Sequence, residues 1–380
     1  MKVIEEIKGT PVTIVTGTGG VGKTTTSCGI AIALAQNLEA KVLVITIDPA
    51  KRLASVLSES TLEHQPKKID HQKFIGEEEA RGELYAAMVD TSQGWKDIVE
   101  RYSKSEKDAE RIFSNNLYSN LTTRFSHSHD FVAMDALYEH YRSGTYDYIV
   151  LDTPPTSQAF GFFDAPQAMS EFFGGRLVKL ITSPYRFGNG RAAKLFDLAS
   201  QPFFALADKV LGKDFLNDIG EFFFLFHTMY DDIVERATSI TSFLTSNKVH
   251  SVLVTDSSQY ISKSFDQMAE GLFDRDIALS FMLINGVPFD LEKDKEIIEA
   301  MEKLSTKDMS QIDSMIQRDV QTSVLLRNEI ESRHMGHREL RESPQIPIAV
   351  VPRILDLEIV PRIKELVRII QNLSLIDDTI

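Results

Sequence analysis

A cluster of glycines followed by a lysine and two threonines stands near the start of the chain. Glycines let backbone N–H groups turn inward around an anion, and an adjacent lysine and hydroxyl supply a cation and a metal ligand. The cluster comprises Gly17, Thr18, Gly19, Gly20, Val21, Gly22, Lys23, Thr24 and Thr25. The pattern G-x-x-x-x-G-K-T predicts a phosphate-binding loop in which Lys23 contacts the β- and γ-phosphates of a nucleotide and Thr24 ligates Mg²⁺.

Two aspartates end apolar runs elsewhere in the sequence. Asp48 closes the run 41–48 and Asp152 closes the run 148–152. Ligands of parallel α/β folds bind at the carboxyl ends of strands, so we expect both acids beside the bound phosphates. One would hold Mg²⁺ through water and the other would orient the attacking water. The alternative is that each aspartate only caps a helix.

Short apolar, β-branched runs alternate along the chain with longer helical patterns. These runs and patterns predict the strands and helices that must position the loop and the two aspartates. Several runs are apolar throughout, as in strands covered on both faces of a parallel sheet. The expected strands are 12–16, 41–48, 148–152, 251–255, 278–285 and 346–351, with a weaker one at 83–89. Together with a helix at 25–36, they predict an α/β fold with a doubly wound, mostly parallel sheet.

Other segments do not fit this alternation. Helical patterns at about 94–142 and 157–247 predict two insertions that form a helical subdomain on a single P-loop domain spanning 1–380. The charged segment 291–342 indicates solvent-facing helices. The amphipathic stretch 355–375 favours packing on the core over a membrane anchor.

Composition excludes several classes of protein. A formal net charge of −14 argues against general nucleic-acid binding. The single cysteine, Cys28, makes neither an internal disulfide nor a cysteine-rich metal site. Residues 1–9 do not resemble a signal peptide, and no apolar run reaches the ~18 residues of a spanning helix. We therefore expect a soluble, cytoplasmic protein with no transmembrane segment and no nucleic-acid partner.

Three motifs carry a family resemblance. They are G-G-V-G-K-T-T in the loop, I-D-P-A at 47–50 and D-T-P-P-T at 152–156. Together they resemble the ArsA/Get class of ATPases, which belongs with the MinD- and ParA-type P-loop proteins. The runs around Asp48 and Asp152 are similar to those of the bacterial ArsA-related branch called anion-transporting ATPases.

The resemblance implies roles for the polar residues. Lys23 would be the Walker A lysine and Thr24 the Mg²⁺ ligand. Asp48 would be the catalytic residue that activates water, and Asp152 would lie near Mg²⁺. Thr24, Asp48 and Asp152 would thus surround the metal, partly through water.

The resemblance also implies a base-binding region. Asn285 would hydrogen-bond adenine, and Pro352 would lie in a loop that flanks the base. The alternative for Asn285 is a turn residue before Gly286. The sequence has no N-K-x-D motif at this position, which favours ATP over GTP.

Two features depart from the family pattern. Relatives carry a second lysine near the start of the loop that reaches the partner's nucleotide across a dimer, and Thr18 occupies this position here. Lys51 and Arg52 are the nearest substitutes; the alternative is a solvated pair at a helix start. Relatives that bind zinc or arsenite use several cysteines, so Cys28 alone disfavours metalloid binding.

Two further motifs admit a functional and a plain structural interpretation. His127 and His129 could ligate a metal, but a polar loop or helix cap is favoured. Many of the 23 phenylalanines fall between residues 160 and 243. They indicate either a groove for a hydrophobic client, as in the family's targeting ATPases, or an ordinary helical core.

The leading hypothesis is a Mg²⁺-dependent ATPase that acts as a nucleotide-driven switch or chaperone-like targeting factor. It would form a nucleotide-dependent homodimer and bind a hydrophobic protein client or a membrane-protein partner. The alternatives are an ATPase subunit that energises anion or metalloid transport, and a nucleotide-binding module with little turnover. A positioning role like that of ParA or MinD is a fourth, disfavoured by the acidic charge.

Overall fold

The protein divides into two compact units. The computed structural model describes residues 2–48, 52–115, 118, 128–154, 159–174, 228–261, 265–288, 314–339, 346–354 and 358–376. Unit 1 comprises 1–88, 139–160 and 244–380, and unit 2 comprises 89–138 and 161–243. The expected insertions, 94–142 and 157–247, overlap most of unit 2. That they form a subdomain of one ATPase domain stays a prediction.

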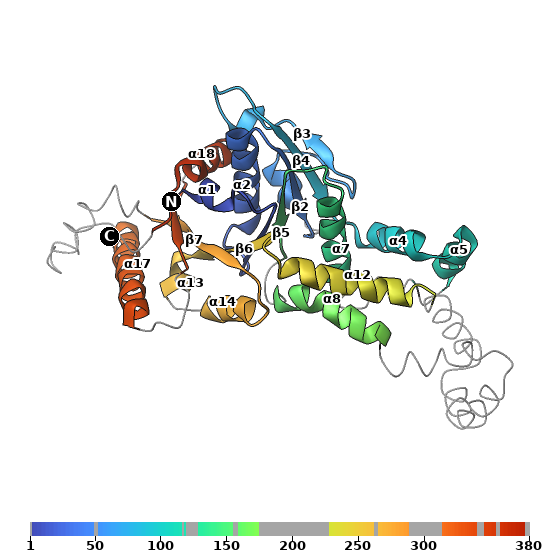
Figure 1. Cartoon of the computed structure of the whole chain (residues 1–380). Helices are drawn as coiled ribbons and strands as arrows, with labels where there is room; N and C mark the ends of the chain where they lie inside the picture. Colours follow the sequence, from blue (N-terminus) through green and yellow to red (C-terminus); the bar gives the residue numbers. More distant parts are fainter. Residues whose placement is uncertain are drawn as a thin grey trace. The chain divides into compact units, whose positions relative to one another are not determined.

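Unit 1 is built on an eight-stranded sheet of order β3-β4-β2-β5-β1-β6-β7-β8 (Figure 1). The strands are β1 Val12–Gly17, β2 Lys41–Thr46, β3 Lys67–Ile69, β4 Glu83–Met88, β5 Tyr148–Asp152, β6 Val249–Asp256, β7 Leu279–Val287 and β8 Ile348–Pro352. Neighbours are parallel except β3, which is antiparallel to β4. The predicted doubly wound α/β fold is confirmed, and each expected strand is present. Only the short β3 was missed, because two exposed lysines in three residues carry no strand pattern.

Helices cover both faces of this sheet. Those of unit 1 are α1 Val3–Ile7, α2 Lys23–Leu38, α3 Arg52–Val56, the 3₁₀ helix η1 Gln72–Phe74, α13 Ser257–Ile261, α14 Asp266–Phe273, α17 Ser314–Glu339 and α18 Ile359–Asn372. Val252 and Val254 of β6 join a core with α1, α2 and α18, whereas Leu253 joins a core with α13, α14 and α17. Successive strand side chains point to opposite faces, so the two cores lie on opposite sides of the sheet.

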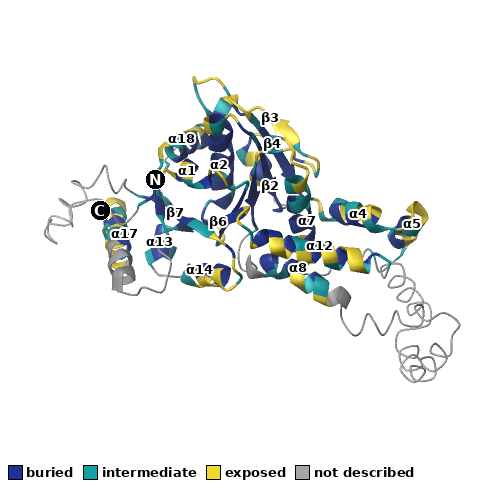
Figure 2. Cartoon of the chain, in the orientation of Figure 1, coloured by how far each residue is buried: buried dark blue, intermediate teal, exposed yellow. Residues whose placement is uncertain are grey.

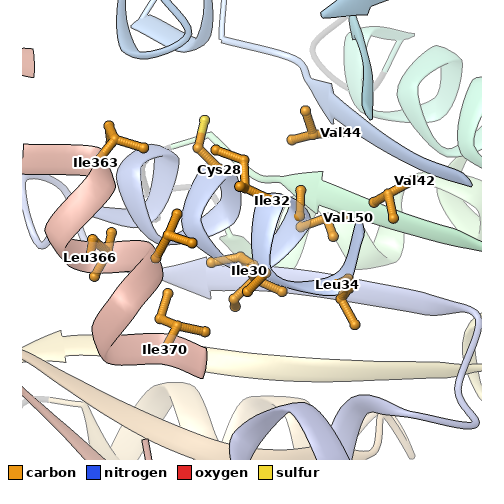
Figure 3. Packing of buried hydrophobic residues seen from close by; sticks show 14 of the residues in the cluster. Cys28, Ile30, Ile32, Leu34, Val42, Val44, Val150, Ile363, Leu366 and Ile370 are labelled. Carbon is orange, nitrogen blue, oxygen red and sulfur yellow. The ribbon is translucent and has the colours of Figure 1, made fainter. Parts of the chain in front are cut away.

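Helix α2 follows the phosphate loop and is buried on almost all sides. Residues 26–36 are buried without exception, and Figure 3 shows Cys28, Ile30 and Ile32 in the cluster between α2, the sheet and α18. Ile363, Leu366 and Ile370 form the buried side of α18. The expected packing of segment 355–375 on the core is therefore confirmed for its described helix, α18.

The prediction of solvent-facing helices at 291–342 holds for most described side chains of helix α17, but it missed a buried stripe. Exposed and buried residues both occur along α17 in Figure 2, and Val320, Leu326 and Ile330 are among the buried ones. Leu326 and Ile330 join the core that contains α13. High overall charge concealed a narrow apolar stripe. Among the helices that the structure describes, none combines the length and apolar character needed to cross a membrane.

Unit 2 is helical in its described parts. Its main helices are α4 Thr91–Tyr102, α5 Glu106–Ser114, α7 Ser128–Arg142, α8 Ala159–Gly174 and α12 Tyr230–Leu244; the last residues of α7 and α12 and the first of α8 count with unit 1. Asp90 and Ser105 cap the N-termini of α4 and α5, because their side chains accept backbone N–H groups of the first turn. The sole tryptophan, Trp95, is buried on α4.

A buried ion-pair network joins three helices of unit 2. Asp135 of α7 accepts hydrogen bonds from Nε of Arg236 on α12 at 2.6 Å and from Arg101 on α4 at 3.1 Å. The Arg236 guanidinium also donates to the Asp135 carbonyl and lies 4.4 Å from the centre of the Tyr138 ring. The negative charge of Asp135 is thus balanced by two arginines that belong to the other two helices.

Candidate functional site

The phosphate loop connects β1 to α2, and two of its glycines touch neighbouring strands. Gly17 has φ +150°, and a Cβ there would lie 2.1 Å from the carbonyl oxygen of Val254 in β6. Gly22 has φ +94°, and a Cβ there would lie 2.3 Å from Nδ2 of Asn285 in β7. Only glycine fits this backbone so close to its neighbours. The sequence therefore places the loop tightly against the ends of β6 and β7.

Lys23 and Thr24 open α2, and both bond to groups within the site. Nζ of Lys23 donates to the carbonyl of Thr18 at 2.8 Å. Burial lowers the pKa of Lys23 from its ordinary value, while the Asp152 carboxylate opposes this shift. Oγ1 of Thr24 donates to Oδ2 of Asp152 at 2.8 Å. The predicted lysine, hydroxyl and one predicted carboxylate therefore lie together.

Asp152 ends β5 and lies between β1 and β2 in the sheet, opposite Val15 and Thr46. Besides Thr24, Oγ1 of Thr46 donates to its Oδ2 at 3.0 Å, and Oγ of Ser27 donates to its Oδ1 at 3.4 Å. Burial raises the pKa of Asp152 to about 6, although these hydroxyls and Lys23 partly oppose the rise. A buried carboxylate with this raised pKa and no arginine partner shown is a candidate for binding a cation.

Asp48 follows β2 and joins the same group. Its backbone N–H donates to Oγ1 of Thr46 at 3.2 Å, so Thr46 links Asp48 to Asp152. Oδ2 of Asp48 lies 3.2 Å from the Arg52 guanidinium at the start of α3. Asp48 is 8% exposed, whereas the Arg52 side chain is 58% exposed. Lys51, the other proposed substitute cation, lies outside the described residues.

Lys23, Thr24, Asp48 and Arg52 line one pocket of about 410 Å³. Its lining residues are Gly20, Gly22, Lys23, Thr24, Thr25, Asp48, Arg52, Ser55, Val56 and Thr153. Lys23 supplies a cation for phosphate, and the loop backbone supplies N–H groups at the start of a helix. The arrangement suits a polyanionic ligand at the carboxyl ends of β1, β2 and β5.

The residues present also fit Mg²⁺. This ion prefers oxygen ligands and is usually held by one or two carboxylates together with substrate phosphates. The Thr24 hydroxyl donates to the Asp152 carboxylate, and Thr24 and Asp48 line the same pocket. Within the described ranges no group of three or more His, Cys, Asp and Glu could hold a metal alone. Thr24, Asp152 and Asp48 could therefore complete a magnesium site only with the ligand.

Three other predicted residues, Thr18, Asn285 and Pro352, are not among those that line this pocket. Thr18 donates its hydroxyl to Oε1 of Gln259 in α13. Asn285 donates Nδ2 to the carbonyl of Val21 at 2.9 Å, so it contacts the loop backbone. Pro352 ends β8, two strands from β6. A role for Asn285 or Pro352 in binding adenine stays a prediction.

The remaining motifs lie away from this pocket. Cys28 is fully buried in the core, and burial raises its thiol pKa well above the usual range. His129, in the first turn of α7, bonds through Nδ1 to Oγ1 of Thr91 at 2.8 Å, whereas His127 lies outside the described residues. Among the phenylalanines of the segment 160–243, the side chains of Phe162, Phe163 and Phe243 are buried; the side chains of the others lie outside the described ones.

The parallel sheet and its glycine-rich loop define a P-loop nucleotide-binding protein. The chain belongs to the anion-transporting ATPase family, whose sequence profile matches residues 10–337. It is 32% identical over 176 residues to "ATPase GET3" of Rhodotorula glutinis, covering 45% of this chain and 44% of that protein. It is 30% identical over 161 residues to "ATPase ASNA1 homolog" of Plasmodium chabaudi chabaudi, covering 42% and 37%. The chain thus spans less than half the length of these two curated relatives.

Sequence reasoning missed three polar residues that contact the predicted ones. Thr46 and Ser27 donate to Asp152, and Gln259 accepts from Thr18. Thr46 lies within an expected strand and Ser27 within an expected helix. A single hydroxyl residue inside such a segment does not form a recognisable sequence motif. Thr46 lies two residues before Asp48 in an expected strand, and alternate strand residues share a face. This spacing could have indicated that Thr46 lies near the site. Gln259 gave no signal in the sequence.

Proposed function

We propose that this chain is a Mg²⁺-dependent ATPase that works as a nucleotide-driven switch. The observation that carries the proposal is that Lys23, Thr24 and Asp48 line one pocket beside the phosphate loop and that Thr24 bonds to the buried Asp152. Membership of an ATPase family supports the same reaction. ATP is the proposed nucleotide, with Asn285 and Pro352 on the side of the base.

Each residue has a proposed task in hydrolysis. The loop N–H groups and Lys23 bind the β- and γ-phosphates and favour the charge that develops on them. Thr24 and Asp152 would hold Mg²⁺, which neutralises phosphate charge when bound. Asp48, held by Thr46 and Arg52, orients the attacking water and accepts its proton. Thr46 fixes the spacing between Asp48 and Asp152.

Single-turnover hydrolysis of ATP with Mg²⁺ tests the proposal. Lys23→Ala should weaken ATP binding, and Asp48→Asn should bind ATP but cleave it about 10²- to 10³-fold more slowly. Unchanged cleavage in Asp48→Asn would remove Asp48 from the reaction. Lack of ATP binding by the wild-type chain would remove the function altogether.

The source of a further catalytic cation is a separate part of the proposal. Thr18 is neutral, and Arg52 contacts Asp48 at the edge of the pocket. We propose that Arg52 and Lys51 assist turnover, so a Lys51→Ala, Arg52→Ala double variant should hydrolyse ATP more slowly. Full turnover in that variant rules this out. A chain with little turnover of its own would instead be a nucleotide-binding module.

In this proposal the chain forms a cytoplasmic homodimer, and the homodimer binds and releases a hydrophobic client. Helix α8 starts at Ala159, a short distance along the chain from Asp152, which supports a link between nucleotide state and helices. Light scattering with and without a non-hydrolysable ATP analogue tests the dimer. Crosslinking to an apolar helical peptide tests the client, and capture that is independent of nucleotide would contradict the switch.

Coupling to anion transport is the second candidate, favoured by the family description. Metalloid anions are a poor fit, because the only cysteine is buried. Stimulation of ATP hydrolysis by arsenite would overturn this preference for the client-binding switch.

A further inference from the structure

We propose that Gln259 is a positioning residue for the phosphate loop and that it acts through Thr18. The Thr18 hydroxyl donates to Oε1 of Gln259 at 2.5 Å. The two residues are far apart in the sequence, so this contact exists only because β6 lies beside β1 in the sheet. The inference rests on the proposed ATPase function and adds a residue outside its pocket.

Gln259 is itself held in place at the start of α13. Asp256, the last residue of β6, accepts the backbone N–H groups of Ser258 and Gln259 through Oδ1 at 2.9 Å each. The same oxygen accepts the Ser258 hydroxyl at 2.6 Å. An aspartate that satisfies the first N–H groups of a helix fixes where that helix begins. The backbone of Gln259 is therefore set by β6.

The next residue anchors α13 to the core. Tyr260 is fully buried and stacks on Phe265 with 5.0 Å between the ring centres. Both belong to the cluster that includes Leu326 and Ile330 of α17. Aromatic stacking and burial leave α13 little freedom to shift. Gln259 thus projects from a rigid support.

Thr18 connects this support to the phosphate-binding lysine. Its side chain bonds to Gln259, and its carbonyl accepts Nζ of Lys23 at 2.8 Å. The preceding residue, Gly17, is pressed against the carbonyl of Val254 in β6. The first half of the loop is consequently located by β6 and α13. Loss of the Gln259 contact would leave Thr18, and through it Lys23, less well placed for phosphate.

Steady-state kinetics with ATP and Mg²⁺ on the full chain test this role. Gln259→Ala and Thr18→Val each remove one neutral hydrogen bond, so we expect the KM for ATP to rise about 3- to 10-fold with kcat changed less than twofold. The double variant should show the KM of a single variant, because both remove the same bond. Thr18→Ser keeps the hydroxyl and should restore the wild-type KM.

A matched control distinguishes this role from a general loss of stability. Gln371 also bonds through its side chain, to Asn37, at the far end of α2 from the loop, so Gln371→Ala should leave the KM unchanged. An unchanged KM in Gln259→Ala, or effects that multiply in the double variant, would overturn the inference while wild-type hydrolysis upholds the ATPase. A wild-type chain that neither binds nor hydrolyses ATP would overturn both.

Discussion

Asp152 in unit 1 and Asp135 in unit 2 are both buried carboxylates, but their surroundings differ. Asp135 is paired with Arg236 and Arg101. Asp152 accepts only hydroxyl groups in the contacts that the structure shows, with Lys23 nearby. An aspartate matched by two guanidinium groups stabilises a fold, whereas one with neutral donors keeps its charge available for a ligand.

The difference shows how burial alone fails to identify a functional acid. Both carboxylates are almost inaccessible to solvent, at 4% for Asp135 and 1% for Asp152. What separates them is the charge of their partners. A substitution should therefore damage stability in one case and activity in the other, and four experiments test how far this holds.

The largest effect is expected at Asp135. Asp135→Asn leaves the buried Arg236 charge without its counter-ion, which typically costs about 3–5 kcal/mol of folding free energy. Urea unfolding followed by fluorescence measures this in unit 2, because the only tryptophan, Trp95, is buried there. An Asp135→Leu, Arg236→Met double variant should recover much of the loss. Equal instability of the single and double variants would count against a charge-based explanation.

A substitution at Asp152 should reduce ATPase activity more than stability. Asp152→Asn removes a proposed Mg²⁺ ligand and should slow ATP hydrolysis about 10²- to 10³-fold. Its free energy of unfolding should stay within about 1 kcal/mol of the wild type, since removing a buried charge offsets weakened hydrogen bonds. Circular dichroism during urea unfolding provides the comparison. A loss as large as that of Asp135→Asn would erase the distinction between the two acids.

His250 extends the comparison to a buried base. Burial lowers its pKa to about 4, and Nε2 lies 2.9 Å from Oγ1 of Thr13. An unfolded histidine titrates near ~6.5, so between these values the unfolded state binds more protons. Stability should therefore fall as pH drops from about 6.5 to 4, by roughly 3 kcal/mol. His250→Gln should flatten this part of the stability profile, and an unchanged profile would assign the acid sensitivity to other groups.

The smallest effect is expected at the ion pair between Asp48 and the exposed Arg52. Arg52→Ala breaks the contact with Asp48, but the Arg52 side chain is 58% exposed. Exposed pairs contribute little, so thermal or urea unfolding should change by less than about 1 kcal/mol. A larger change would mean that charge pairing matters for stability even where water has access.

The strands and the loop could be predicted because they depend on local pattern. Apolar runs such as 148–152 define buried strands, and the glycines around Lys23 define the phosphate loop. The contact between Thr18 and Gln259 depends on β6 lying next to β1, which no local pattern encodes. The arginine partners of Asp135 also come from two other helices, α4 and α12. In α17, charge on one side hid the apolar stripe on the other.

Helix α2 is enclosed by the sheet and α18 along most of its length. Backbone amides in such a helix exchange with solvent only when a large part of the unit opens. We therefore expect hydrogen–deuterium exchange in residues 28–36 to be among the slowest in the chain, and to respond little to nucleotide. Protection that changes with ATP should appear instead at the residues around the loop, where Asp48 and Gln259 approach it.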